Sequence, residues 1–67
     1  MIRVNGEPSP VDPGETVAAL LAALGVADRG RGLAVAVDGE VVPRGEWEVR
    51  ELADGARVEV LTAMQGG

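Results

Sequence analysis

The sequence predicts an α+β fold, with about five short strands in a mixed sheet and one main helix across one face. Three observations support this prediction. Stretches of alternating apolar and polar residues recur along the chain, one apolar repeat has helical spacing, and turn pairs containing Gly separate these stretches. A chain of 67 residues holds one domain with a small core. Elements with one apolar face each are satisfied when the helix covers one side of the sheet.

The chain begins with a predicted hairpin. Residues 1–4 alternate in the period of a half-buried strand, and Asn5-Gly6 is a strong hairpin-turn signal. The return stretch, residues 7–12, contains two prolines, which cannot donate ladder hydrogen bonds. We therefore expect an edge strand there.

A short helix is predicted after a turn at residues 12–15. Thr16 is suited to the N-cap, and Gly25 to the left-handed residue that closes the helix. We interpret the apolar stripe between them as core rather than as a cofactor-binding face. Its members are spaced i, i+3, i+4 and i+7: Val17, Leu20, Leu21 and Leu24.

Residues 26–32 are a predicted loop that contains Arg29-Gly30-Arg31-Gly32. A solvated connection is favoured over a phosphate-binding nest, since no strand–loop–helix order surrounds the glycines. A second hairpin follows, with strands at 33–37 and 40–42 joined by the turn pair Asp38-Gly39.

The last strand is predicted at Arg57 to Leu61, after a third turn at Asp54-Gly55. Trp47, the only aromatic residue, lies in the irregular segment before that turn and is expected to cover the small core. The predicted order is strand, strand, helix, strand, strand, strand. Residues 1–61 form the expected domain, and 62–67 a flexible tail.

Composition limits the function. The net charge of −5, from six arginines and eleven acidic residues, disfavours binding to nucleic acids and anionic membranes. With neither Cys nor His, the chain is expected to hold no catalytic residue and no metal. No stretch approaches the ~20 apolar residues of a membrane span, and residues 1–5 lack a signal-peptide pattern. A cytoplasmic protein is expected.

The last six residues, 62–67, carry no charged side chain and end in Gly66-Gly67. Glycine has no Cβ, so an extended Gly-Gly end fits a narrow tunnel in another protein, where the chain's own carboxylate would be the reacting group. The alternative is an ordinary frayed terminus. The tail alone does not distinguish a reacting carboxyl end from a frayed terminus, and the other parts of the sequence are needed to choose between them.

Taken as a whole, the chain resembles the ThiS-type sulfur carriers of thiamine biosynthesis, which have the ubiquitin-like β-grasp fold. The resemblance covers essentially the full length. It is carried by the diglycine end, the length near 67, the strand Ala34-Val35-Ala36-Val37 that continues through its turn into Val41-Val42-Pro43-Arg44, and Trp47 three positions later.

The resemblance implies that the first and last strands lie side by side and parallel in the middle of the sheet. It implies that the Gly67 carboxylate is adenylated by an E1-like adenylyltransferase of the ThiF type, which uses ATP and magnesium. A sulfur donor protein then converts the adenylate to a thiocarboxylate, which delivers sulfur to a thiazole synthase of the ThiG type. The chain itself would bind no cofactor and would not be an enzyme.

Partner recognition is expected to be shared between the tail and the sheet face beside it. Met64 either fills a partner pocket or is an unremarkable tail residue. Arg44 either pairs with an acidic partner site or stacks over Trp47. Asp54 and Glu59 are interpreted as a solvated face. The candidate contact residues are Gly66, Gln65, Met64, Ala63 and Thr62 in the tail, and Leu61 and Arg44 on the domain.

Other functions stay open at this point. A ubiquitin-like modifier would use the same activation chemistry to join Gly67 to lysines of other proteins. A carrier of the same kind would serve another pathway, such as molybdopterin synthesis. A plain interaction module would have an incidental tail.

Overall fold

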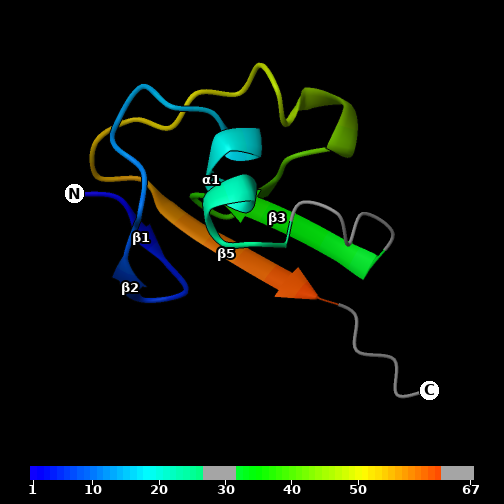
Figure 1. Ribbon diagram of the computed structural model, residues 1–67, viewed down its shortest axis with the longest axis horizontal. Helices are drawn as coiled ribbons and strands as arrows, with labels where there is room; N and C mark the ends of the chain where they lie inside the picture. The colour runs from blue at the N-terminus through cyan, green and yellow to red at the C-terminus, as the bar shows by residue number, and fades with distance from the viewer. Residues whose placement is uncertain (27–31, 63–67) are drawn as a thin grey trace.

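The computed structural model describes residues 1–26 and 32–62. The predicted order of elements is confirmed within these residues. The elements are β1 (Arg3–Val4), β2 (Glu7–Pro8), α1 (Val17–Ala23), β3 (Leu33–Val37), β4 (Glu40–Val41), a short 3-10 helix η2 (Arg44–Glu46) and β5 (Arg57–Thr62). The helix lies across one face of the sheet, as Figure 1 shows.

The five strands form one mixed sheet in the order β2-β1-β5-β3-β4. β1 is parallel to β5, with Arg3 beside Arg57 and Val4 beside Val58. The other three pairings are antiparallel. The parallel pairing of the first and last strands is therefore confirmed, and β5 runs through the middle of the sheet (Figure 1).

Four strand boundaries differ from the prediction. β1 begins at Arg3 instead of residue 1. β2 stops at Pro8 instead of continuing to residue 12, because the Ser9 hydroxyl accepts a hydrogen bond from the Val11 amide (2.9 Å) and turns the chain. β4 ends at Val41. The predicted end of the last strand at Leu61 is one residue short, because Thr62 still pairs with the first residue of β3. The expected boundary between domain and tail thus falls inside β5.

The helix begins and ends where its capping residues predict. The Thr16 hydroxyl accepts a hydrogen bond from the Ala19 amide (3.1 Å), and Gly25 has a φ of +77° just after the last turn. Three members of the apolar stripe are buried, which confirms the core interpretation. Leu24 is the exception: it is the C-cap residue and is 38% exposed.

The core fills the space between α1 and the sheet. Its aromatic cover is Trp47, which is 8% exposed and donates a hydrogen bond from Nε1 to the Val42 carbonyl (2.9 Å). Its backbone carbonyl accepts from the Ala18 amide (2.9 Å) and ties this segment to the start of the helix. The expected structural role of Trp47 is confirmed. The buried residues are Ile2, Val4, Val17, Leu20, Leu21, Val35, Val37, Val42, Trp47, Leu52, Ala56 and Val58.

Arg29, Gly30 and Arg31 of the arginine- and glycine-rich loop lie outside the described residues, as do the tail residues 63–67. In the described part of the chain, no helix has the length and apolar character needed to cross a membrane.

Candidate functional site

The described end of β5 is the root of the predicted tail. Its last two residues point to opposite faces of the sheet, as strand geometry requires. Leu61 pairs with Ala34 and lies on the face away from α1, where it is 65% exposed. Thr62 pairs with Leu33 and lines a hollow on the helix side. Of the six predicted tail residues, only Thr62 is described, and 63–67 lie outside the described residues.

An apolar patch surrounds Leu61 on the face away from the helix. We call it the outer-face patch; its apolar residues are Ala34, Ala36, Val41 and Leu61, and the acidic Glu59 lines the same hollow. The pairing register places Ala34 opposite Leu61 and Ala36 opposite Val41. Val41 is 74% exposed. A contiguous apolar patch on the surface of so small a domain is typical of a protein contact site.

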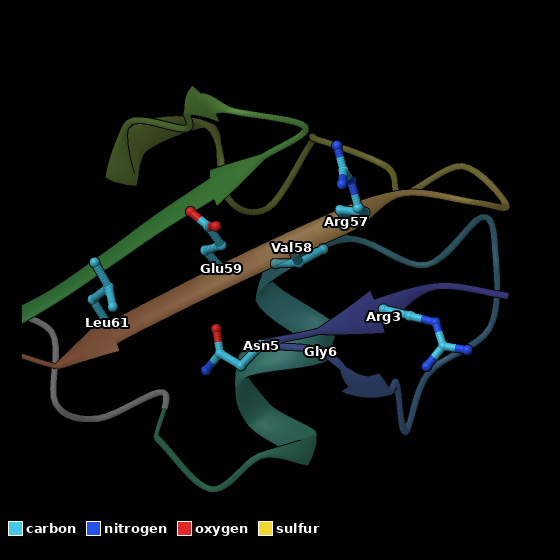
Figure 2. Close-up of a pocket in the computed structure, with 7 residues that line it drawn as sticks. All are labelled: Arg3, Asn5, Gly6, Arg57, Val58, Glu59 and Leu61. Carbon is cyan, nitrogen blue, oxygen red and sulfur yellow. The ribbon is translucent and has the colours of Figure 1, made fainter.

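The other end of the same face carries two arginines. Figure 2 shows the open hollow between β1 and β5, with Arg3, Arg57 and Leu61 among its lining residues and the helix behind the sheet. Arg3 and Arg57 are neighbours in the parallel register, and their exposed side chains project from this face. This face therefore combines two cationic groups and the outer-face patch, with the carboxylate of Glu59 between them.

Arg44 lies elsewhere. Its guanidinium carbon is 5.7 Å from the centre of the Trp47 ring, within the range of a cation–π contact. The hollow that it lines is formed with the helix residues Ala18 and Leu21. Of the two readings of Arg44, the structure shows the stack on Trp47. Among the described residues, Arg44 and Leu61 line different hollows.

Asp54 and Glu59 are both exposed, as predicted. Asp54 also forms a hydrogen-bonded ion pair with the ammonium group of Met1, and this contact lowers the pKa of the Asp54 carboxyl. Within residues 1–26 and 32–62, no cluster of three or more acidic side chains has the arrangement of a metal site.

Asn5 and Asp38 lie next to β5, and the sequence identifies both only as turn residues. Asn5 hydrogen-bonds to the backbone of Val60, and the Asp38 carboxylate accepts from the Arg57 amide (2.9 Å). Asn and Asp in a Gly-containing turn signal the turn itself. Nothing in the local pattern shows which strand their side chains reach.

The model of the ThiS family matches residues 2–67, a range that includes every candidate tail residue. The sulfur carrier protein ThiS of Thermus thermophilus is 40% identical over 67 residues, which cover 100% of both chains.

Two solved structures are similar over nearly the whole fold. The crystal structure of the thiamine biosynthesis protein (ThiS) from Geobacter metallireducens matches with a TM-score of 0.74 and 41% identity, covering 98% of this chain and 97% of that one. The NMR solution structure of a thiamine biosynthesis protein from the same organism matches with a TM-score of 0.73 and 41% identity, covering 98% and 86%.

Proposed function

The chain belongs to the ThiS family and has the ubiquitin-like β-grasp fold, and on that premise we propose that it is a sulfur carrier of thiamine biosynthesis. The observation that carries the proposal is the extent of the match. The relative from Thermus thermophilus, named as a sulfur carrier, aligns over its whole length, and the family match reaches residue 67. The group proposed to carry the sulfur is the carboxylate of Gly67.

A free carboxylate is a poor electrophile, so it has to be activated first. In the proposed sequence, an oxygen of the Gly67 carboxylate attacks the α-phosphorus of ATP, and the bond to pyrophosphate breaks. This gives an acyl-adenylate. Hydrosulfide, which a thiol reductant releases by cleaving the S–S bond of a persulfide on the donor protein, then attacks the carbonyl carbon; a C–S bond forms, the bond between that carbon and the AMP oxygen breaks, and AMP leaves. The product is a C-terminal thiocarboxylate, a reactive group kept on a protein as in covalent catalysis.

This chemistry assigns the catalytic groups to partner proteins. The activating partner is an E1-like adenylyltransferase, and ATP with magnesium is its substrate. The acceptor is a thiazole synthase, which takes the sulfur from the thiocarboxylate. The proposal agrees with a sequence that has neither Cys nor His, the side chains most often used as nucleophile and base.

The domain supports the tail from the centre of the sheet. β5 pairs with β1 at its start and with β3 along its length, so the chain enters the tail from a strand that stays paired as far as Thr62. Beyond Thr62, the sequence supplies two glycines at its end, and these suit a tunnel too narrow for side chains. A rigid root and a slender end are what insertion into an enzyme requires.

The outer face beside Leu61 is the proposed partner contact on the domain. A complementary partner surface has an apolar area opposite the outer-face patch, acidic groups opposite Arg3 and Arg57, and a hydrogen-bond donor or cation opposite Glu59. Aromatic stacking already engages Arg44 within the chain, so a smaller contribution to partner binding is expected from it.

Intact-mass measurement tests the proposal. After incubation with ATP, magnesium, the activating enzyme and a sulfur donor, the wild-type chain should gain about 16 Da, because sulfur replaces one oxygen of the terminal carboxylate. Deletion of Gly67 should abolish the gain. Glu46→Gln is the matched control, since it alters an exposed side chain that has no proposed partner role and should leave the gain intact.

Two outcomes would contradict the proposal. One is an unchanged mass for the wild-type chain in the complete reaction. The other is a set of conjugates of higher mass that depend on Gly67 and form without any thiocarboxylate, which would indicate a ubiquitin-like modifier instead.

A further inference from the structure

The pairing of β1 with β5 ends before β5 does. The Arg3 amide donates to the Ala56 carbonyl (3.0 Å), and the Asn5 amide donates to the Val58 carbonyl (2.8 Å). Each step advances two residues on both strands, so the next peptide groups due on this edge of β5 are those of Val60. β1 has no residue to offer there, because Asn5 has a φ of +52° and the chain turns away.

The side chain of Asn5 fills this place. Its Oδ1 accepts a hydrogen bond from the Val60 amide (3.0 Å), and its Nδ2 donates to the Val60 carbonyl (3.1 Å). Both distances are normal for N–H···O bonds. A primary amide carries the same donor and acceptor as a peptide group, so the side chain substitutes for the residue that β1 lacks. Figure 2 shows Asn5 beside β5, on the side of the root.

Val60 thus has a neighbour on both edges of β5, the Asn5 side chain that bonds its peptide groups on one edge and Val35 of β3 in the pairing register on the other. The two residues that follow it, Leu61 and Thr62, have paired partners only in β3. The Asn5 side chain is therefore the last contact on the β1 edge before the tail.

We propose that Asn5 is a positioning residue for the tail, which fixes the direction in which the chain leaves the sheet and so favours its insertion into the activating enzyme. This inference rests on the proposed carrier function. Without the Asn5 amide, the end of β5 gains conformational freedom on its β1 edge. That freedom has to be removed when the tail binds, and ordering one further residue corresponds to a factor of about 5–30 in binding.

Asp38 supplies a matched control. It has the same φ of +52° in a turn of the same kind, and its carboxylate also hydrogen-bonds to β5, but at Arg57, the other end of the strand. Glycine adopts positive φ without strain, so Asn5→Gly and Asp38→Gly each remove one side chain and preserve the turn. The two variants differ in which end of β5 is released.

The experiment measures two quantities for the wild type and both variants. The first is protection of the Val60 amide from hydrogen exchange in the free chain. The second is the set of KM and kcat values for ATP-dependent activation, with the carrier as the varied substrate. We expect Asn5→Gly to lose protection at Val60 and to raise KM about 5–30-fold with kcat unchanged. Asp38→Gly should leave both quantities at their wild-type values.

A KM for Asn5→Gly equal to that of Asp38→Gly, or full protection of Val60 in Asn5→Gly, would overturn the inference. Asn5→Asp is a second variant should the glycine variant fail to fold, because it retains the acceptor for the Val60 amide and lacks the donor; it should raise KM by a smaller factor. If the wild-type chain is not activated at all, the carrier function fails, whereas wild-type activation with an unchanged variant KM refutes only the role of Asn5.

Discussion

The turn at Asn5-Gly6 and the turn at Asp38-Gly39 have almost the same backbone, and each lies against β5. The φ angles are +52° and +85° in the first turn and +52° and +86° in the second. Their leading side chains differ in what they bond. Asp38 accepts one hydrogen bond from the Arg57 amide, whereas Asn5 both accepts from and donates to Val60.

The difference follows from which backbone hydrogen-bond partners of β5 are missing at each turn. At the start of β5, the Asp38 amide still donates to the Arg57 carbonyl (2.8 Å), and only an acceptor for the Arg57 amide is missing. A carboxylate supplies an acceptor. At the end of β5, both peptide groups of Val60 lack a backbone partner on the β1 edge, and an amide supplies both. The choice between Asp and Asn in a hairpin turn thus depends on the strand beside it.

The largest loss of stability is expected from a substitution in the core, and the losses expected from substitutions in the two turns can be compared with it. Trp47→Ala should lower the free energy of unfolding by about 3–5 kcal/mol, because it removes a large buried side chain and the hydrogen bond to Val42. Denaturant unfolding measures the change. If a substitution in either exposed turn lowered the free energy of unfolding by as much as Trp47→Ala, the hydrogen bonds from the turn to β5 would not be enough to explain the loss.

The two glycines test whether the turn backbones are equivalent. Gly6→Val and Gly39→Val each place a β-branched side chain at positive φ, which should cost about 1–3 kcal/mol. Neither site has other atoms near the added Cβ, so backbone strain alone should set the cost. Denaturant unfolding should give similar values for the two variants. A clear inequality would break the backbone comparison.

Exchanging the leading residues sharpens the side-chain comparison. Asn5→Asp should cost about 1–2 kcal/mol, because the donor to the Val60 carbonyl is lost and a carboxylate oxygen faces that carbonyl. Asp38→Asn retains an acceptor for the Arg57 amide and should change stability by less than about 0.5 kcal/mol.

Denaturant unfolding at several pH values tests the effect of the carboxylate charge that Asn5→Asp introduces. The cost of Asn5→Asp should shrink as the pH falls below about 4, since a protonated carboxyl regains a donor. If Asn5→Asp and Asp38→Asn lowered the free energy of unfolding equally at every pH, it would not be true that Val60 needs both a donor and an acceptor whereas Arg57 needs only an acceptor.

The smallest effect is expected at Asp54, in the turn that leads into β5. The hydrogen bond and the charge of the Met1 ammonium lower the pKa of its carboxyl, so the pair stabilises the fold above the unfolded pKa and is lost as the pH falls through the folded pKa. Asp54→Asn should lower the melting temperature slightly at neutral pH and low salt. High salt should remove most of the difference, because both groups are exposed. If the drop in melting temperature were the same at high and low salt, the Asp54 side chain would act through a hydrogen bond to the backbone rather than through its charge.

The sequence predicts the elements because local patterns determine them. Alternation identifies the strands, and the apolar stripe and its caps identify the helix. Where the prediction is wrong, a longer-range effect intervenes. Leu24 fits the stripe but caps the helix beyond its last turn, and is exposed there. Thr62 continues β5 because β3 offers a partner in Leu33, which no local signal in the last strand shows.

The candidate site is less predictable from sequence than the fold. The alternation of the last strand already implies that Leu61 faces away from the buried side. The bond between Asn5 and Val60 spans 55 positions and depends on the register of two strands, which periodicity does not specify. For Arg44, the sequence leaves two partners open, and the position of Trp47 beneath the guanidinium decides for the aromatic ring.

The central place of β5 also bears on how the protein is made. A growing chain that has not reached Arg57 holds two separate hairpins, β1 with β2 and β3 with β4, which have no common strand to join them. Hairpins of this size are at best marginally stable alone. A product that ends before Arg57 is therefore expected to stay unfolded and open to proteolysis, whereas one that ends after Thr62 already contains every strand of the sheet.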